Sequence, residues 1–320
     1  MNATALASKS IALFGATGTI GTATLHALRA AGHDVVCILR PDTAAKHDRA
    51  IGFDFGGPDA AARLASILPD VDAVVSCLAS RTGGPSDAWA IDYQAHADIL
   101  AAAKDKGVGQ FVLLSAICVQ KPELPFQQAK LAFEQDLQAS GLTYSTVRPT
   151  AFFKSLSGQV KRVQEGRGFL VFGDGRGTAC KPISDRDLGR YITLCLDDPT
   201  LQNRVLPIGG PGPAITARRC GEMLFELTGQ PPKFKSVPLR MMDVIVGVLG
   251  GLGRVFPTLA AKADFARIGR YYATESMLVW DGSRYDADAT PEFGEDTLFD
   301  HYRALIAGDV TADLGDHAVF

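Results

Sequence analysis

Several features that mark common protein classes are absent from this sequence. Its six cysteines form no CxxC pair, and its six histidines are scattered without the spacing of a metal site. Metal centres require such groupings, so we expect no metal. The net charge is only -3, which argues against a nucleic-acid partner, because that partner usually requires a basic face. A reduced, cytosolic and metal-free protein is the simplest interpretation.

We also expect neither a membrane span nor a targeting segment. The first strand-like run starts about ten residues into the chain, so we expect no signal or transit peptide before it. The most apolar stretch, Met241–Gly253, is about thirteen residues long and is bracketed by Asp243 and Arg254, whereas a span needs roughly twenty residues. We expect a buried helix or the wall of an apolar pocket there. Peripheral contact with a membrane stays open if the substrate is lipid-like.

The first half of the chain alternates strand-like and helix-like segments, the pattern of a parallel sheet covered on both faces. The 320 residues, 47% of them hydrophobic, suffice for one large or two modest domains. Expected strands are 10–14, 34–39, an edge piece at 51–55, 73–78, 110–115 and 143–148, and expected helices are 19–31, 59–68, 88–106 and 127–139. The sequence therefore predicts an α/β fold with a Rossmann-type, doubly wound parallel sheet.

Beyond Pro149 the pattern becomes irregular. Five glycines at 166–177 surround an apolar run and predict a hairpin or a mobile loop. Further expected elements are helices at 185–196 and 216–228 and a short strand at 205–208. We expect a cofactor-binding core at 1–156 and a smaller, irregular substrate-binding region at 157–320, with elements from about 178 to 210 returning to the core.

The most informative local pattern is a glycine-rich turn between the first strand and the first helix, in the run GATGTIG at 15–21. Glycine is needed where φ is positive, or where a side chain would keep a phosphate away from the main chain. The start of the helix adds free N–H groups and a partial positive charge. This context indicates a dinucleotide site, with cofactor-binding candidates Gly15, Thr17, Gly18, Thr19, Ile20 and Gly21.

The residue that closes the second strand indicates which dinucleotide binds. An acidic residue there binds the ribose 2′-hydroxyl of NAD, whereas an arginine accommodates the 2′-phosphate of NADP. Strand 34–39 ends in Arg40, so we predict NADPH as the cofactor, with a merely solvent-facing arginine as the alternative. Asp54 is a candidate for binding the adenine amino group.

From the glycine turn onward the chain resembles the short-chain dehydrogenase superfamily, in which a serine, a tyrosine and a lysine four positions later reduce a carbonyl. Ser115 and Lys130 match two of these positions, but the tyrosine position holds Phe126, which has no proton to give. That departure counts against ordinary carbonyl reduction. Lys130 can still hold the nicotinamide ribose by charge-assisted hydrogen bonds, and a plain surface lysine is the alternative.

A narrower resemblance is carried by LLSAICVQKP (113–122), FQQAKL (126–131), VRPTAFFKSL (147–156), FGDG (172–175), ACKPIS (179–184) and YYATESM (271–277). These blocks resemble the NADPH-dependent divinyl chlorophyllide 8-vinyl-reductases over nearly the whole chain. The resemblance implies conversion of the 8-vinyl group of divinyl chlorophyllide a, or a related tetrapyrrole, to an ethyl group in chlorophyll or bacteriochlorophyll biosynthesis. It also implies a cytoplasmic bacterial protein, with peripheral contact to a photosynthetic membrane left open.

Two other functions stay open at this point. One is a reductase of another conjugated substrate, similar to the isoflavone reductases. The other is a NADP-sensing regulatory protein without catalysis, for which the loss of a catalytic tyrosine would be unsurprising. The retained Lys130 and the large apolar C-terminal region argue against the second alternative.

The vinyl-reductase resemblance suggests why a tyrosine is dispensable at position 126. Hydride added to the terminal carbon of a conjugated vinyl group leaves a carbanion delocalised over the macrocycle, so no oxyanion needs a phenol beside it. A weaker acid, or water, then protonates the adjacent carbon, and the candidate donor residues are Cys118, Lys154, Lys181 and Tyr272. We assign Lys130 and Cys118 as catalytic candidates, Ser115 as a further cofactor contact, and Phe152, Phe153, Lys154 and Tyr272 as substrate-binding candidates.

Overall fold

A seven-stranded sheet forms the centre of the computed structural model, which describes residues 8–253 and 256–309. The strand order is β3-β2-β1-β4-β5-β6-β9, and every neighbouring pair is parallel. The strands are β1 (Ser10–Phe14), β2 (Asp34–Leu39), β3 (Ala50–Gly52), β4 (Ala73–Ser76), β5 (Gln110–Leu114), β6 (Thr143–Pro149) and β9 (Arg204–Ile208). The predicted doubly wound sheet is confirmed.

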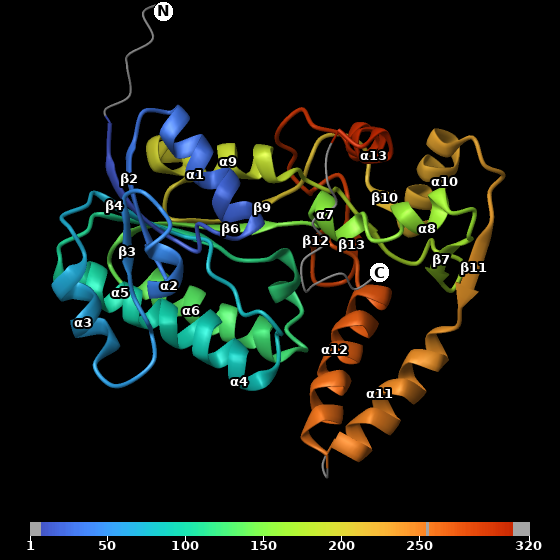
Figure 1. The fold of residues 1–320 in the computed structure, drawn as a ribbon, viewed down its shortest axis with the longest axis horizontal. Coiled ribbons are helices and arrows are strands. Elements are labelled where there is room, and N and C mark those ends of the chain that lie inside the picture. Colours follow the sequence, from blue (N-terminus) through green and yellow to red (C-terminus); the bar gives the residue numbers. More distant parts are fainter. Residues whose placement is uncertain (1–7, 254–255, 310–320) are drawn as a thin grey trace, which may run out of the picture.

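Helices cover both faces of this sheet (Figure 1). On one face lie α1 (Thr19–Ala30) and α9 (Asp185–Asp197), and on the other lie α3 (Ala60–Ile67), α5 (His96–Asp105) and α6 (Pro125–Ala139). Successive side chains of a strand point to opposite faces, so Ile11 and Leu13 of β1 enter one apolar layer and Phe14 enters the other. Both faces are therefore apolar, as a parallel sheet between helices requires.

The helix expected at 88–106 changes pitch part of the way along. A short turn, α4 (Pro85–Asp87), leads into a π-helical segment at Ala88–Ala95, and α5 begins only at His96. Such wider turns occur often at functional sites. Here the π-helical segment holds Asp92 in the interior, with only 1% of its surface exposed.

A second, smaller lobe lies beside the sheet (Figure 1). It contains α8 (Val160–Gln164), β7 (Phe169–Phe172), α10 (Ala217–Thr228), β11 (Phe234–Val237) and α13 (Leu298–Ala307) around a separate apolar core. The expected hairpin at 166–177 is wrong, because β7 pairs in parallel with the distant β11. No local pattern could predict this pairing, since the two strands are far apart in the sequence.

Two helices, α11 (Leu239–Gly253) and α12 (Pro257–Thr274), form a helical pair that projects from the body (Figure 1). Of the two alternatives expected at 241–253, the buried helix is wrong, because α11 has no buried residue and packs mainly against α12, whereas the helix does line one wall of a cavity. Small residues leave a cavity of about 550 Å³ between the helices, lined partly by Gly247, Gly250, Ala263 and Arg267. Within residues 8–253 and 256–309, every helix is too short or too polar to cross a membrane.

Short elements connect these layers. They are α2 (Pro41–Ala44), a 3₁₀ turn at Ile117–Gln120, α7 (Phe153–Leu156), β8 (Ala179–Cys180), a 3₁₀ turn at Pro199–Leu201, β10 (Ile215–Thr216), β12 (Val279–Trp280) and β13 (Tyr285–Asp286). β8 pairs with β10, and β12 with β13, in each case antiparallel. α9 and β9 follow the first part of the small lobe in sequence, yet they pack on the large sheet and join it.

Candidate active site

The glycine turn after β1 is shaped by contacts that exclude larger side chains. Gly15 has φ +75°, and a Cβ there would lie 2.6 Å from the carbonyl carbon of Cys77, just after β4. A Cβ on Gly21 would lie 2.0 Å from the oxygen of Gly15. The turn is therefore pressed against the loop after β4, where the strand order changes direction. Open α/β sheets bind ligands at such a switch point.

The first turn of α1 fits the pyrophosphate of a dinucleotide. Gly18 is the N-cap, and no side chain caps the helix, so the first N–H groups lack an intrahelical partner. Thr17, Gly18 and Thr19 are exposed, whereas the side chain of Ile20 is buried, which leaves only its N–H for a ligand. These are the donors that an anion at a helix N-terminus needs.

Arg40 and Asp54 follow neighbouring strands at the same edge of the sheet. Arg40 is exposed directly after β2, and its carbonyl accepts the N–H groups of Thr43 and Ala44 at the start of α2. Asp54 follows β3, and its Oδ1 accepts the N–H of Gly56 at 2.9 Å. Both residues lie where the adenosine end of a dinucleotide would extend from the glycine turn.

The side chain of Lys154, a residue of α7, reaches the start of α1, and sequence reasoning missed this contact. Its Nζ donates to the Thr19 hydroxyl at 2.9 Å, although the two residues are 135 positions apart. A cation beside a helix N-terminus can neutralise a bound phosphate. Lys154 therefore lies at the phosphate end of the candidate cofactor site, whereas the sequence suggested contact with the substrate.

Ser115 belongs to a buried polar cluster beneath the site. Its hydroxyl donates to Glu134, which is fully buried, and the Arg148 Nε donates to both carboxylate oxygens of Glu134 at 3.1 Å. The ion pair between Glu134 and Arg148 satisfies charges that burial would otherwise penalise. Because its proton is engaged in this cluster, the Ser115 hydroxyl can offer a ligand its oxygen lone pairs. Sequence reasoning did not find Glu134 or Arg148.

Lys130 is held by Asp92 of the π-helical segment. Its Nζ lies 2.9 Å from Asp92 Oδ1, which also accepts the Ser80 N–H at 3.1 Å. Asp92 Oδ2 is buried and has no hydrogen-bond partner among the described residues. A lysine ammonium has three donors, so the contact with Asp92 fixes its place and leaves capacity for ribose hydroxyls.

His96 lies beneath this ion pair and stays neutral near pH 7. Its Nε2 is 2.9 Å from the Ser76 hydroxyl and its Nδ1 is 2.9 Å from the Ile91 carbonyl oxygen. Burial, reinforced by the charge of Lys130, lowers the pKa of His96 to about 4. His96 therefore adds no positive charge beside Lys130 at neutral pH.

α12 contributes a phenol to the cluster around Cys118. Tyr272 and Phe126 both pack against this apolar cluster, and the Tyr272 Oη lies 3.8 Å from the sulfur of Cys118. The neighbouring Tyr271 donates to the carbonyl oxygens of Cys118 and Lys121 at 3.0 and 3.1 Å, which anchors α12. Burial raises the pKa of the Cys118 thiol and raises that of Tyr272 well above 10, so both groups keep their protons.

One face of α12 lies against the loop after β4, next to this cluster. A Cβ on Gly83 would lie 3.1 Å from Ile268 Cδ1 and 3.3 Å from Phe126 Cδ1, and a Cβ on Gly84 would lie 3.6 Å from Asp264 Oδ2. Asp264, Ile268 and Tyr272 are spaced by four residues and so share that face. The loop after β4, the start of α6 and α12 therefore converge on one place.

The other predicted site residues, Phe152, Phe153 and Lys181, are engaged in contacts with other parts of the protein. Phe153 is buried in the core of the small lobe, 5.3 Å from the His301 ring, and Phe152 is half-buried at a bridge to Ile183. Lys181 is buried, and its Nζ contacts Glu292 at 2.6 Å and the Thr290 carbonyl oxygen at 3.2 Å. Lys181 therefore ties the chain near β8 to the C-terminal segment, a structural role.

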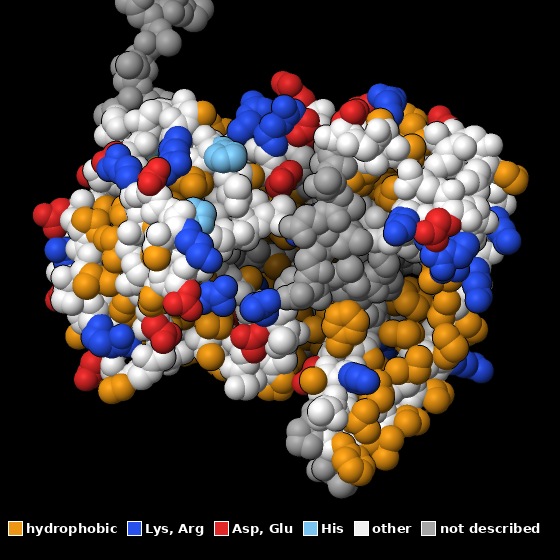
Figure 2. Space-filling model, viewed as in Figure 1, with side chains coloured by type: hydrophobic (Ala, Val, Ile, Leu, Met, Phe, Trp, Pro, Cys, Tyr) orange, Lys and Arg blue, Asp and Glu red, His pale blue; other side chains and the backbone are white. Residues whose placement is uncertain are grey.

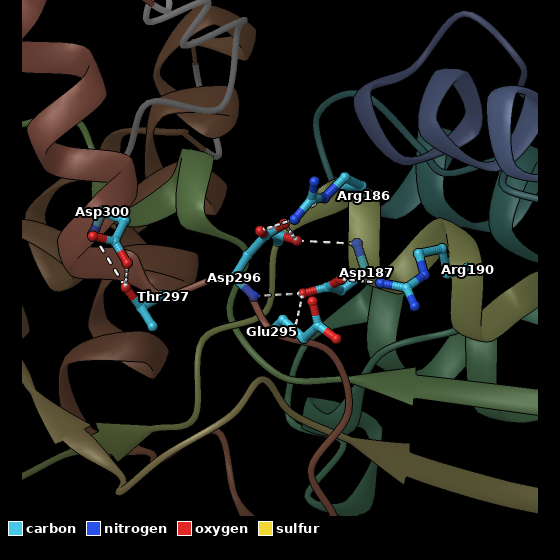
Figure 3. Close-up of polar contacts among 8 residues, drawn as sticks. Arg186, Asp187, Arg190, Glu295, Asp296, Thr297 and Asp300 are labelled. Atoms are coloured by element: carbon cyan, nitrogen blue, oxygen red, sulfur yellow. Dashed lines mark hydrogen bonds and ion pairs between the residues drawn. The ribbon is translucent and has the colours of Figure 1, made fainter.

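A polar junction joins the two lobes on another side (Figure 3). The carboxylate of the buried Asp187, at the start of α9, accepts the N–H groups of Glu295 and Asp296 at 3.0 and 2.9 Å. Asp296 in turn pairs with Arg186. Gly294 is required here, because a Cβ would lie 2.2 Å from the Asp187 carboxyl carbon. This junction fixes the segment before α13 to the large sheet.

Comparisons with known proteins agree with this geometry. A family model described as NAD(P)H-binding matches residues 15–199. The chain is 45% identical to the chloroplastic divinyl chlorophyllide a 8-vinyl-reductase of Cucumis sativus, over 97% of this chain and 80% of that protein. It is 46% identical to the protein of the same name from Zea mays, over 97% and 83%.

Among solved structures, the fold resembles the NADPH-dependent quinone oxidoreductase QOR2 from Escherichia coli in complex with NADPH. The TM-score is 0.68, with 17% identity, over 92% of this chain and 99% of that one. At that identity the likeness concerns the fold alone. The two plant relatives, by contrast, match this chain along nearly all of its length, the small lobe and α12 included.

Proposed function

The chain belongs to the divinyl chlorophyllide a 8-vinyl-reductases, and from that premise we propose how it converts the C8 vinyl group of a divinyl chlorophyllide to an ethyl group with NADPH as reductant. It is an oxidoreductase that acts on a carbon–carbon double bond. The observation that carries the proposal is that the chain has a lysine at position 130 but a phenylalanine, and not a tyrosine, at position 126. This arrangement retains the nicotinamide-side cation and omits the acid that carbonyl reduction needs.

The cofactor would be held along one line of residues. The N–H groups of Thr19, Ile20 and Gly21 would bind its pyrophosphate, with Lys154 as counter-charge. Arg40 would bind the 2′-phosphate, and Lys130, fixed by Asp92, would bind the nicotinamide ribose. When bound, NADPH supplies a hydride from its nicotinamide.

The substrate must then receive hydride and a proton on neighbouring carbons. Hydride on the terminal vinyl carbon would leave negative charge on the carbon beside the ring, where the macrocycle delocalises it. A proton delivered to that carbon completes the ethyl group. We propose Tyr272 as its donor, because it packs against the same apolar cluster as Phe126 and burial keeps its phenol protonated. Cys118, 3.8 Å away and also protonated, is the second candidate.

The order of addition has a direct test. Reduction of divinyl chlorophyllide a with NADPH deuterated at the transferred position, in ordinary water, should place the label on the methyl carbon of the new ethyl group. Mass spectrometry and NMR of the product locate it. Label on the carbon next to the ring would overturn the proposed order.

The same assay separates this function from the two alternatives. A reductase of another conjugated substrate would bind NADPH but leave divinyl chlorophyllide unchanged. A NADP-sensing protein would bind NADPH without turning over any vinyl compound. The near-full-length relatives favour the vinyl-reductase, and the anaerobic assay with NADPH and divinyl substrate should give a shift in pigment absorbance.

The partner of this reaction is a flat, apolar macrocycle, which water dissolves poorly. We therefore also propose peripheral contact with a photosynthetic membrane on its cytoplasmic side, where such pigments are held. Contact without a span is consistent with the helices of the described residues, each too short or too polar to cross a bilayer.

A further inference from the structure

The helical pair α11–α12 carries an apolar face that no other part of the described chain covers. Val244 is 63% exposed, Val248 54% and Leu252 46%, and Met241 and Ile245 extend the same side of α11. Their spacing by three and four residues places them on one face of a helix. Phe256 and Phe265 continue the surface onto the turn and α12. Figure 2 shows hydrophobic side chains gathered over α11 at the lower right of the molecule.

The charges around this face are mainly positive. Between Leu227 and Phe265 the sequence has two acidic residues, Asp243 and Asp264, against the basic residues Lys233, Lys235, Arg240, Arg254 and Lys262. Asp264 is paired with Arg267. The charge of Asp243 is already paired with Arg270 of α12. Three of these basic residues are exposed: Lys233 just before β11, Lys235 within it and Arg240 at the start of α11. In Figure 2, Lys and Arg side chains border the apolar surface on its upper right side.

We propose that this face, formed by residues 239–253 and 256–265, docks on the surface of an anionic lipid bilayer. Apolar side chains would enter the boundary between headgroups and acyl chains, while the lysines and Arg240 contact lipid phosphates. The inference rests on the proposed function only for the reason why docking is useful, which is access to a pigment in the membrane. The surface lies on the same helical pair that carries Tyr272, so docking would bring the mouth of the candidate site to the pigment in the membrane.

A second copy of this chain fits the surface less well. A two-fold contact is made by the same patch on both copies, so it would bring the cationic border of one copy against that of the other. Apart from Met241, Phe256 and Phe265, the apolar patch consists of aliphatic residues and glycines, and it lacks the tryptophan and tyrosine that are enriched among the dominant residues of protein interfaces. Self-association is therefore an outcome for the test to detect.

The test is flotation of the full-length protein with vesicles of phosphatidylcholine, with and without about a third phosphatidylglycerol. We expect binding to the anionic vesicles that weakens with salt. The double variant Val244→Glu/Val248→Glu should lower the partition coefficient at least about tenfold, because two carboxylates would enter the interface. Lys233→Gln/Lys235→Gln should weaken binding to the anionic vesicles, so that the variant binds anionic and neutral vesicles to a more similar extent than the wild type does.

The matched control is Ile67→Glu/Leu194→Glu, which alters two exposed apolar residues, 38% and 42% exposed, on α3 and α9. It should bind vesicles like the wild type. Thermal melting and NADPH binding of each variant verify its fold. Failure of the wild type to bind anionic vesicles, or equal loss in the control, overturns the inference.

Light scattering addresses the alternative occupant. A wild-type dimer that Val244→Glu/Val248→Glu converts to a monomer, without vesicle binding, overturns the inference in favour of self-association. Vesicle binding that the variant abolishes, in a protein with no vinyl-reductase turnover in detergent, would leave the docking surface standing and refute the proposed function. The two ideas can thus fail separately.

Discussion

The two ends of the candidate site are built in opposite ways. The phosphate end is a contiguous turn, residues 15–21, whose shape follows from glycines in close contact with Cys77 and with each other. The chemical end combines Asp92, Cys118, Phe126, Lys130 and Tyr272 from four separate segments. The phosphate end can be predicted from a short stretch of sequence, whereas the chemical end depends on how a π-helical segment and α12 pack.

This difference predicts that substitutions at the phosphate end act through the backbone. Gly21→Ala should weaken NADPH binding at least about hundredfold, roughly 3 kcal/mol, because its Cβ would collide with the Gly15 oxygen. Titration by nucleotide fluorescence measures the affinity. Gly18→Ala is the informative control: its Cβ would be 3.6 Å from the Gly15 oxygen, so melting should be unchanged and only affinity should fall. Equal melting losses in both variants would contradict this account.

At the chemical end, Lys130→Met should lower kcat/KM about a hundredfold, as expected when a charge-assisted contact to a bound ribose is lost. Steady-state turnover of divinyl chlorophyllide a measures it. Asp92→Asn keeps the lysine but loosens its anchor, so it should raise the KM for NADPH more than it lowers kcat. If Lys130→Met leaves both turnover and NADPH affinity unchanged, the assignment of Lys130 fails.

Tyr272→Phe should lower kcat about a hundredfold with little change in NADPH affinity, at the lower end of the range for loss of a general acid. A larger solvent isotope effect would accompany the loss, because proton delivery would become slower. Cys118→Ser is the companion variant and should have the smaller effect. The opposite order would make Cys118 the donor.

Arg40→Ala should reduce the preference for NADPH over NADH about tenfold, since one charged contact to the 2′-phosphate is lost. The ratio of kcat/KM for the two cofactors measures this preference. Lys46→Ala, a few residues further on, serves as a control for general loss of positive charge. An unchanged ratio in Arg40→Ala would show that Arg40 only faces solvent.

The smallest effect concerns pH and His96. Its pKa is about 4 in the folded protein, below the usual 6.5, so the unfolded chain binds a proton that the folded protein does not. Stability should be unaffected above about pH 6.5 and should fall between pH 6.5 and 4, by about 1 kcal/mol at pH 5.5. Urea unfolding at pH 7.5 and 5.5 measures the difference, and His96→Gln should show correspondingly less of it. Equal pH dependence in both proteins would exclude this cause.

Local patterns predicted the large sheet well, because each strand and helix has its own hydrophobic period in the sequence and glycines follow the ends of the helices. They failed where partners are distant. The parallel pairing of β7 with β11, the Glu134–Arg148 pair under Ser115 and the contact of Lys154 with Thr19 each join segments that no spacing relates. Exposure of α11 was also missed, because an apolar run looks the same whether it faces a core or a surface.

The amino-acid sequence alone was enough for the sheet and the family, since those depend on short runs of residues, and it predicts a dinucleotide turn and, from Arg40, a preference for NADPH. The tertiary structure decided that Lys130 meets the buried Asp92 and that α12, from the far end of the chain, joins the cluster of Cys118 and Phe126. It also decided that α11 is a surface. Packing determines both, since burial and contact are properties of the assembled layers and not of any single segment.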